Sequence, residues 1–205
     1  MNINYQKEMD NLITENQSNN RVPTLLLHAC CAPCSSYVLE YLSEYFNIKV
    51  LYYNPNISPV EEYDYRLQEE QRLIDTLNTK NKVELIKGDY NPSLFFDAVK
   101  GFEKEPEGGK RCEICFKLRL EESARYCKKI NADYFATTLT ISPLKNAEKI
   151  NAIGESIGEK FGVKYLPSDF KKKNGYKRSI ELSREYNLYR QNFCGCIFSK
   201  TESSN

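Results

Sequence analysis

Seven of the eight cysteines in the sequence fall into three close-spaced groups. The groups are Cys30-Cys31-x-x-Cys34, Cys112-x-x-Cys115 and Cys194-x-Cys196. Several thiolates at short spacing are typical of a metal site, because zinc, iron and iron–sulfur clusters all take sulfur ligands. Cys34 and Cys112 also fall at predicted helix starts, where backbone N–H groups favour the thiolate form that binds metal. We therefore interpret all seven as metal ligands.

The number of thiols leaves the kind of metal open. Four sulfurs complete either a structural zinc site or a 4Fe–4S cluster, and three then remain for a second site. Cys30 and Cys31 are adjacent at a predicted strand end, and successive strand side chains point to opposite faces of a sheet. One of them could hold a cluster while the other faces a neighbouring ion. We hypothesise two adjacent metal centres, with zinc alone as the alternative.

The eighth cysteine, Cys127, stands apart from these groups. On one helix it would lie 12 residues after Cys115, which is about 18 Å along the helix axis. The two thiols therefore cannot share a metal. We expect Cys127 to be a small buried apolar side chain, which is the common role of a free cysteine on a helix.

The composition fits one folded domain with reduced thiols. The chain has 205 residues, 40% of them hydrophobic, with 29 basic and 28 acidic side chains. No apolar run approaches the roughly 20 residues that span a bilayer, and the polar start of the chain lacks a secretion signal. We expect a cytoplasmic protein with no membrane partner, in which disulfides are rare. The net charge of +1 does not argue for nucleic-acid binding, although residues 101–205 carry +6, which suits either a polyanion or solvated helices.

Short apolar segments alternate with amphipathic ones from residue 24 onward. The predicted strands are Thr24–Ala29, Ile48–Tyr53, Val83–Ile86, Tyr134–Leu139 and Val163–Leu166. This alternation predicts an α/β fold, a three-layer Rossmann-like sandwich with a mainly parallel five-stranded sheet. Ligands of such sheets bind at the C-terminal strand ends, where Cys30 and Cys31 fall. We expect one domain over residues 21–200, a mobile polar extension over 1–20 and a short tail over 201–205.

Five segments carry motifs that occur together in one known family. They are Leu27–Cys34 (LHACCAPC), Tyr52–Ile57 (YYNPNI), Arg111–Leu120 (RCEICFKLRL), Phe135–Asn146 (FATTLTISPLKN) and Tyr189–Cys196 (YRQNFCGC). In content and order they resemble the cobalamin-independent epoxyqueuosine reductases of the QueH type, over about residues 24–198. The seven clustered cysteines coincide with the family's cysteine positions. The likeness does not indicate which of them hold which metal.

The resemblance implies a specific fold and reaction. The fold would be of the adenine nucleotide hydrolase kind, and the cofactors would be a 4Fe–4S cluster and an adjacent mononuclear iron. The enzyme would be an oxidoreductase that reduces the epoxide of epoxyqueuosine, at the wobble position of the anticodon loop of tRNA, to queuosine. That is the last step of queuosine biosynthesis. An external electron donor would be required.

Removing an epoxide oxygen consumes two electrons and two protons, so proton donors are needed beside the metal. The candidates are His28, Asp89, Tyr186 and Tyr189. His28 is the only histidine of the chain, and a histidine within an apolar strand is also typical of a satisfied core residue. Asp89 follows the third predicted strand, where it suits an iron ligand, an acid or a helix cap.

A further set of residues is expected to bind the tRNA substrate. They are Asn54, Ser142, Lys145, Lys171, Lys172, Lys173, Arg178 and Arg190. The run of lysines could follow the RNA backbone, and Tyr176 beside it could stack on an unpaired base. The alternative interpretation of such a run is a solvated loop.

Two other functions stay open from the residues alone. A zinc-stabilised RNA-binding module would use the thiols for structure only. A thiol–disulfide oxidoreductase would use Cys31-x-x-Cys34, because C-x-x-C beside a strand-to-helix turn also fits that class. Iron and acid-labile sulfide would separate both from the leading hypothesis.

Overall fold

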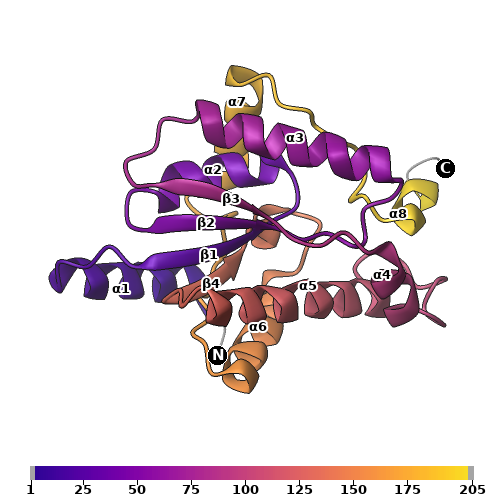
Figure 1. Cartoon of the computed structure of the whole chain (residues 1–205), viewed down its shortest axis with the longest axis horizontal. Helices are drawn as coiled ribbons and strands as arrows, with labels where there is room; N and C mark the ends of the chain where they lie inside the picture. The colour runs from indigo at the N-terminus through magenta and orange to yellow at the C-terminus, as the bar shows by residue number, and fades with distance from the viewer. Residues whose placement is uncertain (1–2, 203–205) are drawn as a thin grey trace.

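The structure, a computed structural model, describes residues 3–202 of the chain (Figure 1). The strands are β1 (Thr24–Ala29), β2 (Asn47–Tyr52), β3 (Val83–Lys87) and β4 (Tyr134–Thr137). The helices are α1 (Tyr5–Ser18), α2 (Ala32–Leu42), α3 (Val60–Thr76), α4 (Pro92–Ala98), α5 (Lys110–Lys129), the 3-10 helix η1 (Thr138–Ile141), α6 (Ala147–Phe161), α7 (Gly175–Glu185) and α8 (Ile197–Glu202). The strands pair in parallel in the order β3-β2-β1-β4, which confirms the predicted parallel α/β fold.

Helices cover both faces of the sheet (Figure 1). Leu25 and Leu27 of β1 point to one face and pack in a cluster to which α1, α2, α3 and α7 contribute. Leu26 points to the other face, where α5 and α6 pack on it. The alternation follows from the strand period of two, and the central strand β1 is buried because both of its faces are covered. The result is the predicted three-layer sandwich.

The sheet has four strands rather than the predicted five. The segment around Tyr165 makes one parallel bridge with Phe135, through hydrogen bonds from Phe135 N to Lys164 O (2.9 Å) and from Leu166 N to Phe135 O (2.8 Å). Pro167 follows at once and has no N–H to continue the ladder. The prediction of a fifth strand was therefore wrong, although this segment does lie at the edge of the sheet.

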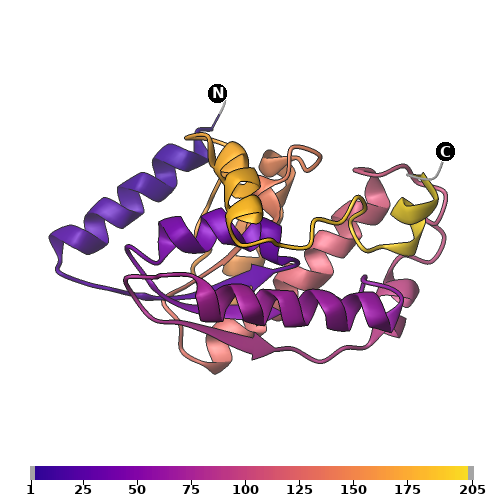
Figure 2. The same cartoon turned by 90° about the horizontal axis from the view of Figure 1, so that it is seen from above.

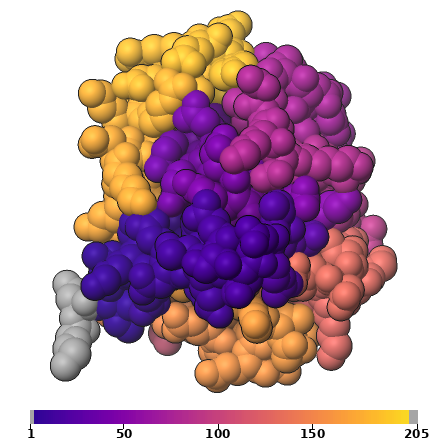
Figure 3. Space-filling view, turned by 90° about the vertical axis from the view of Figure 1, so that its left-hand side faces the viewer, coloured from indigo at the N-terminus to yellow at the C-terminus, as the bar shows by residue number. Residues whose placement is uncertain are grey.

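The N-terminal segment also differs from its predicted form. Instead of a mobile extension it contains α1, a helix of 14 residues that lies across one side of the molecule (Figure 3). Tyr5, Met9 and Ile13 are buried, and their spacing of four residues puts them on one narrow stripe. The division into domains stays a prediction. Of the predicted tail, α8 includes the first two residues, and 203–205 lie outside the described part of the chain.

The C-terminal strand ends meet at one edge of the sheet. Cys30 and Cys31 follow β1, Asn54 follows β2, and η1 directly follows β4. This is the edge at which parallel α/β sheets bind ligands. Within residues 3–202, no helix combines the length and the apolarity that a bilayer span requires.

Candidate metal centre

Three cysteines meet in the turn between β1 and α2. Cys30 follows β1 directly, Cys31 caps α2 with extended backbone, and Cys34 lies in the first helical turn. Their sulfur atoms all lie within 4.8 Å of one another, and those of Cys30 and Cys31 are 3.8 Å apart. Two thiolates on one tetrahedral ion, each about 2.3 Å from it, are also separated by about 3.8 Å. The spacing of this trio therefore fits one metal ion.

Hydrogen bonding within the trio shifts the pKa values of its three thiols in opposite directions. Hydrogen bonding with Cys31 and Cys34 lowers the pKa of Cys30 well below its usual value. The same hydrogen bonds raise the pKa of Cys34, and that of Cys31 to about 12, because each would ionise beside an existing thiolate. A bound cation would remove this penalty and release protons from the thiols.

The other four clustered cysteines line one small cavity of about 90 Å³. Cys112 and Cys115 come from the first turns of α5, and Cys194 and Cys196 from the irregular segment before α8. The Cys112 sulfur accepts a hydrogen bond from the Gly108 N–H at 3.2 Å. Burial raises the pKa of Cys115 to about 12 and that of Cys196 to about 11.

Two cations line the small cavity and lie near cysteines of both thiol groups. Arg119 of α5 is buried, and Lys145 lies in the loop between η1 and α6. Burial works against the charge of both, but cysteines from both thiol groups, including Cys30 and Cys194, raise the pKa of each side chain. The protein thus places positive charge where several thiolates would gather, which offsets their repulsion.

A larger cavity of about 300 Å³ opens beside both thiol groups. Its lining includes Cys34 of the trio and Cys194 of the small cavity. Leu144 and Lys145 line both cavities, so the two are adjacent. The remaining walls carry polar and aromatic groups, among them Ser142, Tyr176, Arg190 and Gln191. The structure thus brings Ser142, Lys145 and Arg190, three of the predicted substrate-binding residues, to one cavity.

The basic run and Arg178 lie elsewhere, and most of their charges are paired. Lys171 contacts Asp169 (2.9 Å) and Lys173 contacts Asp10 of α1 (2.9 Å). Arg178 binds Glu40 and Glu185, each at 2.7 Å. Lys172 is exposed near the start of α1. These four predicted tRNA contacts line neither the large nor the small cavity.

His28 and Asn54 are buried behind the trio. Hydrogen bonds occupy both ring nitrogens of His28, to Thr137 Oγ1 (3.0 Å) and to the Tyr53 carbonyl (3.1 Å). Burial lowers the pKa of His28 to about 4, so the ring is neutral near pH 7. Asn54 donates to the Ala29 carbonyl at 2.8 Å and thereby fixes the strand end that carries Cys30. Both residues support the strand ends next to the trio.

The other three predicted proton donors are not in the cavities. Asp89 is exposed and lines neither of them. Tyr186 packs against the core cluster that includes α7. The Tyr189 hydroxyl lies 3.3 Å from Glu62 of α3, and its backbone N–H donates to Glu69 at 3.0 Å. The structure places these side chains at the surface, against the core and against α3, respectively.

Four buried charged residues near the thiols were missed by sequence reasoning. Arg66 and Glu70 lie on the buried stripe of α3. On α5, Arg111 lies beside the first cysteine and Arg119 lies one turn after Cys115. Burial raises the pKa of Glu70 to about 8. The available signal was the presence of charged residues at positions where the helix period demands apolar ones. Such residues are buried only where they have partners or a function.

Fold and site together define a parallel α/β protein with a cysteine cluster at its strand ends that could hold a metal. The family model described as Epoxyqueuosine reductase QueH matches residues 25–202. The chain therefore belongs to the QueH family of epoxyqueuosine reductases.

Individual relatives cover most of the chain. Epoxyqueuosine reductase QueH of Streptococcus pyogenes serotype M1 is 44% identical over 199 residues, which are 96% of this chain and 78% of that protein. The enzyme of the same name from Staphylococcus epidermidis is 43% identical over 96% of this chain and 84% of its own length. That from Thermotoga maritima is 37% identical over 87% and 91%. A solved NMN synthetase from Francisella tularensis aligns over 95% of this chain and 77% of its own, with 13% identity and a TM-score of 0.48.

Proposed function

We propose that this protein reduces epoxyqueuosine in tRNA to queuosine. The observation that carries the proposal is the convergence of seven thiols on two adjoining places, both open to one cavity. The reaction converts an epoxide, two electrons and two protons into an alkene and water. The family relationship favours this function over a zinc-stabilised RNA-binding module and over a thiol–disulfide oxidoreductase.

The two thiol groups differ in the cofactor that they fit. The close trio of Cys30, Cys31 and Cys34 suits a single iron with an open fourth position. The four thiols around the small cavity supply the number of ligands that a 4Fe–4S cluster takes. Once bound, the cluster would relay electrons singly and the open iron would act as a Lewis acid toward the epoxide oxygen.

The large cavity is the proposed binding site for the modified nucleoside. Its volume of about 300 Å³ is at the lower end of the range for small-molecule sites. Tyr176 is partly exposed there and can stack on a base, while Arg190 and Ser142 can contact phosphate or sugar oxygens. These assignments replace the paired lysines as the main RNA contacts.

Lys145 is the proposed donor to the departing oxygen. It lines both cavities, and the cysteine charges of both groups keep it protonated. An ammonium group at this point can stabilise negative charge that develops on the oxygen and can deliver a proton to it. His28 cannot take this role, because both of its nitrogens are occupied in the core.

The electrons would come from an external donor, and a tRNA substrate suggests a cytoplasmic location. The direct test is anaerobic turnover of epoxyqueuosine-containing tRNA with a chemical reductant and the iron-loaded protein. Mass spectrometry of the nucleosides should show conversion to a product lighter by one oxygen. An iron-loaded protein that leaves the epoxide intact would overturn the proposal.

A further inference from the structure

The segment 186–196, here called the strap, joins α7 to α8 without regular secondary structure and runs beside α3 (Figure 2). Its second half carries Cys194 and Cys196, and residues 190–194 line the large cavity. A strap without its own backbone ladder must be held by other parts of the protein. Its position therefore decides where two of the seven thiols lie.

One face of α3 supplies most of the contacts that hold the strap. Arg72 donates to the carbonyls of Tyr186 (3.0 Å) and Asn187 (3.1 Å). One turn earlier, Glu69 accepts from the Tyr189 N–H at 3.0 Å. These hydrogen bonds hold the first half of the strap. The second half, which carries Cys194 and Cys196, is held by the N-terminal part of α3.

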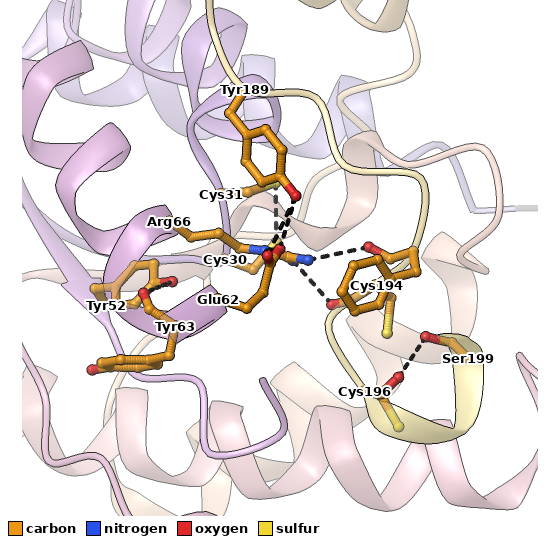
Figure 4. A network of polar contacts seen from close by, with 11 residues as sticks. Cys30, Cys31, Tyr52, Glu62, Tyr63, Arg66, Tyr189, Cys194, Cys196 and Ser199 are labelled. Atoms are coloured by element: carbon orange, nitrogen blue, oxygen red, sulfur yellow. Dashed lines mark hydrogen bonds and ion pairs between the residues drawn. The ribbon is translucent and has the colours of Figure 1, made fainter. Parts of the chain in front are cut away.

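Arg66 holds the second half of the strap, which carries Cys194 and Cys196. Its guanidinium donates to the carbonyls of Cys194 (3.3 Å) and Phe193 (3.4 Å), and it lies 5.1 Å from the centroid of the Phe193 ring (Figure 4). A 2.7 Å contact with Glu62 orients the same group. The Arg66 side chain is 1% exposed, so these bonds are sheltered from water. Hydrogen bonds from a buried charge are stronger than neutral ones and costly to remove.

The strap has a glycine, Gly195, where its backbone approaches the Arg66 side chain. Gly195 has φ of +98°, and a Cβ there would lie 3.1 Å from Arg66 Nη1 and 2.8 Å from Ile57 Cγ1. The Gly195 carbonyl accepts from the Ser58 N–H at 3.0 Å. The close approach of backbone to guanidinium explains why glycine separates the two cysteines.

Arg66 also lies close to the trio. Interaction with Cys31 raises the pKa of Arg66 against the effect of burial, and Figure 4 shows Cys30 and Cys31 beside the guanidinium. A single side chain thus faces the backbone of Cys194 and the thiols that follow β1. Cys194 and the trio come from segments more than 150 residues apart in the sequence.

We propose that Arg66 is a positioning residue that fixes Cys194 beside the large cavity and so sets how the four-thiol group lies relative to the trio. The proposal rests on the proposed function only in treating Cys194 as a ligand. Residues that orient metal ligands typically change metal affinity by about 10- to 100-fold when replaced. Lysine would be a poor substitute, because its ammonium cannot present the planar fork of donors that the two carbonyls and Glu62 require.

The first test uses metal-free protein under reducing conditions and measures the alkylation rate of each cysteine by mass spectrometry. Arg66→Met should raise the rates at Cys194 and Cys196 by about tenfold, because the strap loses its buried anchor. The rate at Cys127, in the core between α5 and the sheet, should not change. Arg125→Met is the matched control, since it removes a surface arginine that pairs with Glu122. It should leave every rate unchanged.

Arg66→Lys keeps the positive charge, and it is the variant that tests the proposal if Arg66→Met does not fold. It should show the same selective rise at Cys194 and Cys196. An equal rise at Cys127 would reveal general loosening and overturn the proposal, as would unchanged rates at Cys194 and Cys196. Because no metal or substrate is present, this outcome is independent of whether the protein reduces epoxyqueuosine.

The second test measures iron release from loaded protein to a chelator. Arg66→Lys should release iron about 10- to 100-fold faster than wild type, whereas Arg125→Met should match wild type. The visible spectrum should change in the Arg66 variant as the cluster loses a ligand. Identical release rates and spectra for wild type and Arg66→Lys would contradict a positioning role.

Discussion

The trio after β1 and the four thiols around the small cavity are built in different ways. The trio lies within five consecutive residues, on a turn fixed by a buried strand and by a helix start with Pro33 in its first turn. The other four thiols come from α5 and from the strap, which are about 80 residues apart in sequence. The first group is preorganised by local backbone, whereas the second exists only after long-range contacts form.

This difference indicates where each centre is vulnerable. Local structure positions Cys30, Cys31 and Cys34, so changes far from the β1–α2 turn should leave them in place. Cys194 and Cys196 depend on Arg66, Gly195 and the packing of α3. Loss of these contacts should affect one thiol group and spare the other.

The largest expected effects come from removing single thiols of either group. Cys31→Ser should abolish binding of the single iron while four-iron cluster content stays near normal, and Cys196→Ser should give the reverse pattern. Each should reduce epoxyqueuosine turnover by about 100-fold or more, since a ligand matters at least as much as the groups that orient it. Iron and acid-labile sulfide analysis, with turnover, measures both.

Cys127→Ser is the control for these variants, because Cys127 is buried in the core and its sulfur lies 3.5 Å from the Ala132 carbonyl. It should cost about 1–2 kcal/mol of stability and leave iron content intact. Equal iron loss from Cys127→Ser and Cys196→Ser would contradict the division of the thiols.

The trio should show a strong pH dependence of metal binding. The pKa values of Cys31, about 12, and of Cys34 are raised above their usual value, whereas hydrogen bonding with its two neighbours lowers the pKa of Cys30. Metal binding must then displace at least the protons of Cys31 and Cys34, so affinity should rise by about 100-fold or more per pH unit around pH 7. Titration with cobalt(II) at several pH values measures the slope. A slope of zero would show that the trio does not bind through these thiols.

A smaller and selective effect is expected from Gly195→Ala. The alanine backbone must adopt a positive φ, and its Cβ would meet Ile57 and Arg66. Together these should lower the free energy of unfolding by at least about 1–2 kcal/mol. The strap should loosen, with faster iron release from the small cavity. Gly162→Ala is the control, since Gly162 also has positive φ (+66°) but nothing within 4 Å of an added Cβ. Thermal unfolding should shift in both variants, and iron release should accelerate in Gly195→Ala alone.

The smallest effect concerns His28, which lies near the trio, the thiol group that local backbone preorganises. His28 is buried beneath the trio with a pKa of about 4, below the usual 6.5. Its neutral form therefore stabilises the fold above pH 6.5, and this contribution is lost as the pH falls toward 4. As the only histidine, it gives one set of imidazole NMR signals. These signals should show an unprotonated ring down to about pH 5. Titration near pH 6.5 would show that the turn is open to water.

Local patterns predicted the elements and the thiol groups well. The alternation of strands and helices indicated the parallel sheet, and adjacency in sequence was enough to bring Cys30, Cys31 and Cys34 together. The strand at Val163–Leu166 failed because its apolar run ends at Pro167 after one bridge. Helix α1 was missed because the polar residues Gln6 and Asn16 share its buried face with its three buried apolar residues, which blurs the apolar period.

Long-range pairing could not be inferred from the sequence. Lys173 and Arg178 are neutralised by Asp10 and Glu40, which are more than 130 residues away in the sequence. The roles of Arg66 and Arg119 likewise depend on which segments they meet. The charge run predicted an RNA surface, and the sequence could not show that most of these charges would be paired in salt bridges. The RNA contact itself stays a prediction.

An iron-57 Mössbauer spectrum of the anaerobically reconstituted wild-type protein tests the central claim most directly. Two thiol groups of different construction should give two kinds of iron, one from a four-iron cluster and one from a separate single ion, with areas near about 4:1. A spectrum with one kind of iron, or a protein that takes up zinc and no iron, would contradict two distinct centres.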